Sequence, residues 1–135
     1  MRAIIFSLVP AVLGLPAKGE DWPNWRGPRF DGISKETLPA KLPDTLPIKW
    51  RANVGFGFSS FSVVGDRVFT MGNQEDRDTV WCLDASTGKV LWQHRYNCKL
   101  DPRYYEGGPG GTPTAHQGSV YTLSKKGHAF RLDLD

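Results

Sequence analysis

Three residues in the middle of the chain, Thr87, Gly88 and Lys89, have the side-chain types that bind phosphate in nucleotide-binding loops. Such a loop surrounds the phosphates with backbone N–H groups, and its Lys neutralises their charge. The pattern also requires a Gly five residues before its second Gly and a Ser or Thr directly after the Lys. This chain has Leu83 and Val90 at those positions. We therefore reject phosphate binding and interpret the tripeptide as part of a structural turn.

The residue types that bind metals do not form a local site either. The histidines are His94, His116 and His128. Their separation matches no zinc motif, so we interpret them as surface or packing residues. Acidic residues surround Arg77: Glu75, Asp76 and Asp78. They lack the spacing of a calcium loop, so we expect a solvated loop of mixed charge, and the sequence predicts neither a metal nor a cofactor.

The segment from Asp101 to Gly111 is the best candidate for a binding surface. It combines aromatic, cationic and anionic side chains with several glycines: Arg103, Tyr104, Tyr105 and Glu106 come directly before Gly107 and Gly108. Tyrosines offer apolar contact area with a polar tip, and glycines let a backbone adapt or be approached closely. We predict a partner-binding loop. The alternative, that the tyrosines only cover the rim of the fold, is equally compatible with the sequence.

The elements that must position this loop are β-strands. Ten prolines and fifteen glycines separate aromatic and β-branched runs, and no window has sustained helical periodicity. We expect an all-β chain with the following strands: 48–52, 59–64, 67–71, 78–84, 89–96, 111–115, 119–124 and 128–133. The Gly65-Asp66 pair, flanked by β-forming residues, is typical of a two-residue hairpin turn.

These strands form an internal repeat. Trp50 and Trp92 are separated by about 42 residues, which is the length of one propeller blade. Residues 119–124 parallel residues 67–72, and residues 129–135 parallel residues 80–86. The equivalent residues Val68 and Val120 are separated by about 52 residues, about ten more than the two tryptophans. We expect these roughly ten additional residues to form a surface loop between the units.

The turn within LDASTGKVLW (83–92) has the chemistry that fixes a strand register. Asp84 and its neighbouring hydroxyl residues can bind turn amides, and Gly88 can adopt a positive φ at low cost. With the register fixed, Trp92 points to one face, where it can seal a sheet against its neighbour. Asp133 ends the corresponding strand of the second unit.

The LDxxTGKxxW pattern, the tryptophan spacing and the paired segments GDRVFTMG and QGSVYTLS resemble the quinoprotein-type, or PQQ-like, β-propeller repeat. The arm DWPNWRGPRFDG resembles the opening of exported bacterial members. The resemblance implies an incomplete propeller over residues 47–135, with one complete four-stranded antiparallel blade, most of a second and an irregular N-terminal arm. It also implies that Trp50 lies in a strand completing another blade of a longer protein.

The resemblance implies a non-enzymatic, exported scaffold that binds a protein or carbohydrate partner, similar to propellers that assist assembly at the bacterial outer membrane. The alternative is the N-terminal part of a PQQ-dependent dehydrogenase whose active site lies beyond residue 135. A different secreted β-protein, such as a sugar-binding module, is the third possibility. We expect no catalytic, cofactor-binding or metal-binding residue in the present chain.

The N-terminus predicts export. Arg2 precedes an apolar run from Ala3 to Leu15 and a small-residue cleavage pattern, so we interpret residues 1–19 as a signal peptide. Residues 20–46 form a Pro- and Trp-rich arm. Without Arg2 and Lys18 the formal charge falls from +3 to +1, which leaves nucleic-acid binding without electrostatic support. We expect a periplasmic, cell-surface or secreted protein with no membrane segment after cleavage.

The two cysteines are an even pair, which an exported chain can oxidise. Pairing around the turn at residues 85–88 places Cys82 opposite Leu91 or Trp92, so Cys98 lies about 20 Å further along the strand. We therefore favour a buried free Cys82 over a disulfide, although the bridge remains an alternative.

Overall fold

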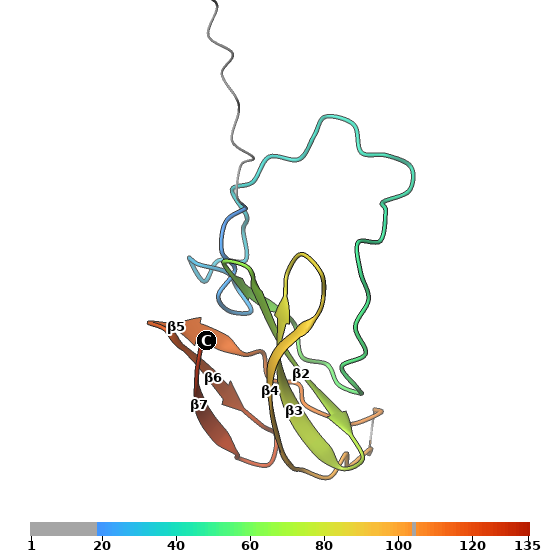
Figure 1. The fold of residues 1–135 in the computed structure, drawn as a ribbon, viewed down its shortest axis with the longest axis vertical. Helices are drawn as coiled ribbons and strands as arrows, with labels where there is room; N and C mark the ends of the chain where they lie inside the picture. The colour runs from blue at the N-terminus through green and yellow to red at the C-terminus, as the bar shows by residue number, and fades with distance from the viewer. Residues whose placement is uncertain (1–18, 104) are drawn as a thin grey trace, which may run out of the picture.

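A computed structural model of the chain describes residues 19–103 and 105–135 (Figure 1). These residues form two antiparallel sheets and contain no helix, and neither sheet closes into a barrel. The expected all-β class is therefore confirmed. The predicted signal peptide, residues 1–19, lies outside the described residues except for Gly19, and Tyr104 of the predicted loop also lies outside them.

Each sheet joins strands that follow one another along the chain. The first sheet consists of β1 (Ser62–Val64), β2 (Arg67–Gln74), β3 (Arg77–Asp84) and β4 (Val90–Asn97), in that order. The second consists of β5 (Thr114–His116), β6 (Ser119–Leu123) and β7 (Ala129–Asp133). This succession was predicted from the alternation of strand and turn signals, and it is confirmed.

One predicted strand is wrong. Residues 48–52 pair with no strand of the described chain, and the strands expected from Ser59 and Gly111 begin only at Ser62 and Thr114. Strand-forming residues need a neighbouring strand to supply hydrogen bonds and packing. The segment 48–52 lacks such a neighbour here, and Trp50 makes a side-chain contact with a turn instead.

The two sheets have the same pairing register. Val68 faces Leu83 in the first sheet, and Val120 faces Leu132 in the second. Beyond each of these pairs the same turn contact follows. Ala85 N donates to Asp66 O at 2.9 Å, and Leu134 N donates to Gly118 O at 3.1 Å. The internal repeat inferred from the sequence is therefore also a repeat of hydrogen-bond geometry.

The main core lies between the two sheets. Fully or nearly fully buried side chains meet there, two from each sheet: Phe69, Cys82, Ala115 and Val120. Three partly buried side chains surround them: Val64, Trp92 and Leu134. One face of the first sheet thus packs on one face of the second, and Figure 1 shows the two sheets side by side.

A segment before β1 covers the opposite face of the first sheet. The Trp81 indole Nε1 donates to Val54 O at 3.1 Å. The Val54 carbonyl also lies so close to Gly72 that a Cβ at this position would meet its oxygen at 1.9 Å. Gly72 is therefore required for close backbone approach. The first sheet is covered on both faces.

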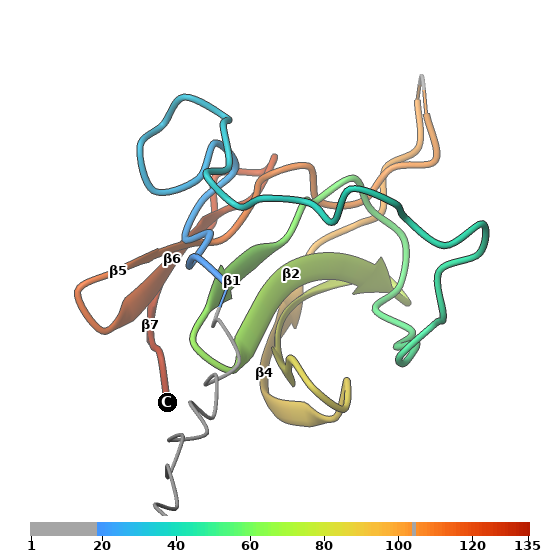
Figure 2. The ribbon, with the colours of Figure 1, turned by 90° about the horizontal axis from the view of Figure 1, so that it is seen from above.

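The N-terminal arm ties the two sheets together. Trp22 exchanges both backbone hydrogen bonds with Val63 of β1, and Ala115 N of β5 donates to Pro23 O at 2.8 Å. Figure 2 shows this blue segment beside β1 and between the sheets. Asp21 Oδ1 also accepts a bond from Gly65 N. The arm is irregular, as predicted, but its first residues are integral to the fold.

Both cysteines are free and buried, so the alternative of a disulfide is wrong. The register explains this result, because Cys82 lies opposite Trp92, whereas Cys98 follows the far end of β4. The extended strand between these positions keeps the thiols beyond disulfide distance.

Candidate functional site

The predicted turn at Asp84 has the expected chemistry. Asp84 Oδ1 accepts bonds from the backbone N–H and hydroxyl groups of both Ser86 and Thr87, at 2.6–3.1 Å. These bonds favour the carboxylate and lower the pKa of Asp84 to about 2, with the Thr87 hydroxyl contributing most. Gly88 has a φ of 70°, which an L side chain rarely adopts.

The two repeat tryptophans make equivalent contacts from different local structures. Trp92 lies in β4, and its Nε1 donates to Leu134 O at 3.3 Å. Trp50 lies outside any strand, yet its Nε1 donates to Ala85 O at 3.0 Å, and its ring covers Gly88. Ala85 and Leu134 each follow a Leu-Asp pair. The repeat is therefore retained at the level of this contact, although Trp50 does not occupy the predicted strand.

Asp133, the last repeat residue predicted from the sequence, ends β7 opposite Ser119. Asp84 has the same place opposite Arg67 in the first sheet. Asp133 is exposed, and Asp135 stands at the position equivalent to Ser86. Asp133 and Asp84 thus occupy equivalent positions in the two sheets.

The loop between β4 and β5 is held by its backbone. Gly107 and Gly108 both have a φ of 87°, and Cβ atoms there would meet Leu100 O at 2.3 Å and Phe56 O at 2.5 Å. Pro109 O accepts a bond from Phe58 N at 2.8 Å. Glycine is therefore needed at both positions because carbonyl groups of the same chain lie close to them. This packing explains the two glycines, so an adaptable loop is not required to explain them.

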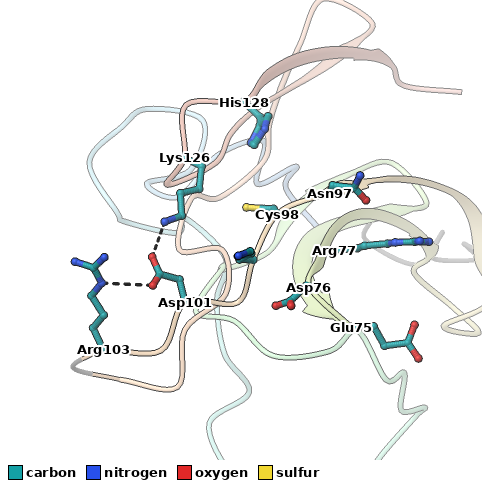
Figure 3. A pocket seen from close by; sticks show the side chains of 10 residues that line it. Glu75, Asp76, Arg77, Asn97, Cys98, Asp101, Arg103, Lys126 and His128 are labelled. Carbon is teal, nitrogen blue, oxygen red and sulfur yellow. Dashed lines mark hydrogen bonds and ion pairs between the residues drawn. The ribbon is translucent and has the colours of Figure 1, made fainter.

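This loop borders a cleft of about 640 Å³ at the end of the two sheets (Figure 3). The cleft is lined by the β2–β3 turn, the end of β4, the loop and the β6–β7 turn. The lining residues are Glu75, Asp76, Arg77, Asn97, Cys98, Lys99, Asp101, Arg103, Lys126 and His128. We refer to this hollow as the charged cleft.

Ion pairs organise one wall of the charged cleft. Asp101 forms ion pairs with Lys126 and Arg103, shown as dashed lines in Figure 3. These cations, chiefly Lys126, lower the pKa of Asp101. Lys125 Nζ donates to Leu100 O at 2.6 Å. Asp101 itself has a φ of 51°. The contacts of Lys125 and Lys126 fix the start of the loop against the second sheet.

A buried polar network supports the opposite wall. Asn73 Nδ2 donates to Asp78 Oδ1 at 2.7 Å and to Cys98 O at 2.8 Å. Burial raises the pKa of Tyr96, and the Asp78 carboxylate adds to the shift. Asp78 is fully buried in β3, so its expected place in a solvated loop is wrong. The residue packs inside the sheet because Asn73 satisfies its carboxylate.

Burial raises the pKa of the Cys98 thiol to about 11, and a hydrogen bond to Asp78 adds to this effect. The thiol is consequently protonated near neutral pH, when it is a poor nucleophile. Cys98 is buried and forms part of the lining of the charged cleft.

The predicted loop residues separate into different environments. Arg103 lines the charged cleft, whereas Glu106 is exposed and outside the lining. Tyr105 is 48% exposed, and its ring meets Phe58 edge to face at 5.2 Å and lies under Lys125 Nζ. Tyr105 thus covers the rim and also remains accessible.

Sequence reasoning missed Lys126 and His128, because only the packing of the second sheet brings their turn to the loop.

No group of three metal-ligand side chains capable of holding an ion occurs in residues 19–103 and 105–135. The same part of the chain has no helix with the length and apolar character needed to cross a membrane.

The chain was compared with protein-family models, with curated proteins and with solved structures, and none of the three comparisons found a match.

Proposed function

We propose that this chain belongs to an exported, non-enzymatic scaffold built from propeller-type repeats, which binds a protein or carbohydrate partner. The observation that carries the proposal is the repeated contact of the two tryptophans. Trp50 and Trp92 each donate to the carbonyl that follows a Leu-Asp pair, at 3.0 and 3.3 Å. The same contact links the segment before β1 to the first sheet and the first sheet to the second, which supports an arrangement of stacked blades.

The direction of stacking supports a further unit on the second sheet. The face of the first sheet that bears Phe69 and Met71 is buried, with exposures of 0% and 2%. In the second sheet the equivalent positions are Tyr121 and Leu123, which are 41% and 63% exposed. Because the contact between the sheets is head-to-tail, another sheet of the same repeat fits this face.

The charged cleft supports the binding role. Asp101 is engaged by Lys126 and Arg103. These groups stabilise the loop and shape the cleft. Arg103 remains accessible in the lining, and Tyr105 is exposed in the same loop, so the loop offers a cation and an amphipathic ring to a partner.

The full-length natural protein, purified from the exporting cell, provides the test against the dehydrogenase alternative. We expect its absorption spectrum to contain no stoichiometric quinone chromophore. We also expect no oxidation of alcohols or sugars with an electron-accepting dye after addition of PQQ and Ca²⁺. Quinone-dependent turnover would overturn the proposal.

The binding role of the loop is tested by a photo-reactive side chain introduced at Arg103. We expect it to crosslink one identified species that binds again when both purified components are mixed. The same side chain at Lys35, an exposed position of the arm, is the control and should not crosslink that species. Equal crosslinking from both positions would contradict a role for the charged cleft.

A further inference from the structure

A second hollow, of about 390 Å³, lies between the arm and the segments that lead into β1 and β5. It is lined by Trp25, Phe58, Ser60, Gly110 and Thr112, and we refer to it as the aromatic groove. None of these residues carries a charge. The lining therefore combines two aromatic rings with two hydroxyl groups and an open glycine, in contrast to the charged cleft.

The backbone around Trp25 is fixed although the side chain is 70% exposed. The buried Asn24 side chain donates from Nδ2 to Gly27 O at 2.8 Å and accepts Arg26 N at 2.9 Å through Oδ1. The preceding Trp22 is bonded to β1. A large apolar ring that is exposed on an ordered turn is a preorganised contact surface, since little backbone entropy is lost on binding.

Phe58 is also exposed and held in place. The side chain is 57% exposed, and its ring meets the Tyr105 ring at 5.2 Å with an interplanar angle of 85°. The Phe58 backbone donates to Pro109 O at 2.8 Å. Both aromatic residues of the groove are therefore positioned by contacts outside it, which leaves their exposed surfaces available to a ligand.

The polar part of the groove provides hydrogen-bonding capacity. Thr112 Oγ1 accepts the Ser60 N–H at 3.3 Å, which leaves the Thr112 hydroxyl proton to donate to a ligand. Gly110 faces open space, because a Cβ at this position would meet no atom within 4 Å. The absence of a side chain at Gly110 keeps the groove open.

We propose that the aromatic groove binds a neutral saccharide. A sugar ring has an apolar C–H face that packs on an aromatic ring and hydroxyl groups that exchange hydrogen bonds with Ser and Thr. An uncharged lining favours a neutral sugar over an acidic one, because no cation compensates the desolvation of a carboxylate. This inference rests on the proposed scaffold function and names the class of its partner.

The test measures binding of the purified chain to neutral glucose-based and N-acetylglucosamine-based hexasaccharides, with hexagalacturonate as the acidic comparator, by isothermal titration calorimetry. Trp25→Ala removes the exposed ring, and Gly110→Leu adds a bulky side chain to the groove from a position where a Cβ meets no atom within 4 Å. Each should weaken binding of a neutral hexasaccharide at least about tenfold, the equivalent of losing one good aromatic contact. Phe30→Ala is the matched control, since Phe30 is a 65% exposed aromatic of the same arm outside the groove.

Binding of a neutral probe that is weakened by both groove variants and retained by Phe30→Ala supports the proposal. It is overturned if no neutral probe binds, if hexagalacturonate binds more tightly, or if both groove variants retain full affinity. Circular dichroism of each variant distinguishes lost binding from lost folding. Failure here leaves the scaffold function standing, whereas quinone-dependent oxidation by the full-length protein removes the scaffold function whatever the groove binds.

Discussion

The two sheets have one register and different surroundings. Phe69 and Tyr121 occupy equivalent positions, yet Phe69 is fully buried and Tyr121 is 41% exposed. The first sheet lies between the second sheet and the segment that carries Trp50, whereas residues 19–103 and 105–135 cover the second sheet on one face. Strand pairing therefore does not determine burial in this chain. The neighbour that lies on each face determines it.

The largest expected difference between the sheets concerns these equivalent rings. Phe69→Ala should lower the free energy of unfolding by about 3–5 kcal/mol, because it leaves a cavity between the sheets. Tyr121→Ala removes a half-exposed ring and should cost less than about 1.5 kcal/mol. Urea denaturation of both variants checks the comparison. Equal losses would contradict the different covering of the two sheets.

A smaller difference is expected between two turn glycines with similar backbone angles, 70° at Gly88 and 74° at Gly118. Gly118→Ala should cost about 1 kcal/mol from backbone strain alone, since its Cβ would meet no atom within 4 Å. Gly88→Ala should cost about 2–3 kcal/mol, because its Cβ would also lie 2.5 Å from the Trp50 ring. Thermal and urea denaturation of both variants provide the measurement. Similar losses of stability for Gly88→Ala and Gly118→Ala would contradict the covering of this turn by Trp50.

The equivalence of the two tryptophan contacts is tested by matched substitutions. Trp92→Phe and Trp50→Phe each remove an indole donor and keep an aromatic ring. Each should lower the free energy of unfolding by about 1 kcal/mol, the usual contribution of one hydrogen bond. Near-zero cost for Trp50→Phe alone would restrict the repeated contact to the strand residue, Trp92.

The smallest effect is a pH dependence at the Asp84 turn of the first sheet. Hydrogen bonds lower the pKa of Asp84 from 3.8 to about 2 in the folded state, so its contribution is complete above pH 4 and is lost as the pH falls to about 2. The stability difference between the wild type and Asp84→Asn should shrink over this interval. Asp133→Asn is the matched control from the second sheet. Denaturant titrations across the acidic range provide the measurement.

Much of the strand arrangement could be predicted from local sequence. The Gly65-Asp66 turn and the residues between Asp84 and Gly88 fix two hairpins, because hydroxyl bonds and positive φ angles act over a few neighbouring residues. The length of the connecting turn placed Cys82 opposite Leu91 or Trp92, and an irregularity in the pairing between Cys82 and Leu83 selects Trp92. The strand predicted around Trp50 was wrong because its pairing depends on a neighbour that local sequence does not specify.

The candidate sites are less accessible to sequence reasoning. The loop at residues 101–111 was recognised from its composition, but the cations that complete its wall of the charged cleft come from the β6–β7 turn. Asp78 was assigned to solvent because its neighbours are charged, and only the Asn73 side chain explains its burial. Likewise, Trp25 and Thr112 are distant in sequence and meet only where the arm joins both sheets.

The sequence by itself determined the all-β class, the order of the hairpins and the repeated unit, since turn geometry and alternation are local properties. Tertiary structure alone decided which faces are buried, which cations surround Asp101 and which aromatic rings remain exposed beside hydroxyl groups. These properties depend on the approach of segments that are far apart in the chain. Identical registers in the two sheets consequently place Phe69 in a core and Tyr121 at a surface.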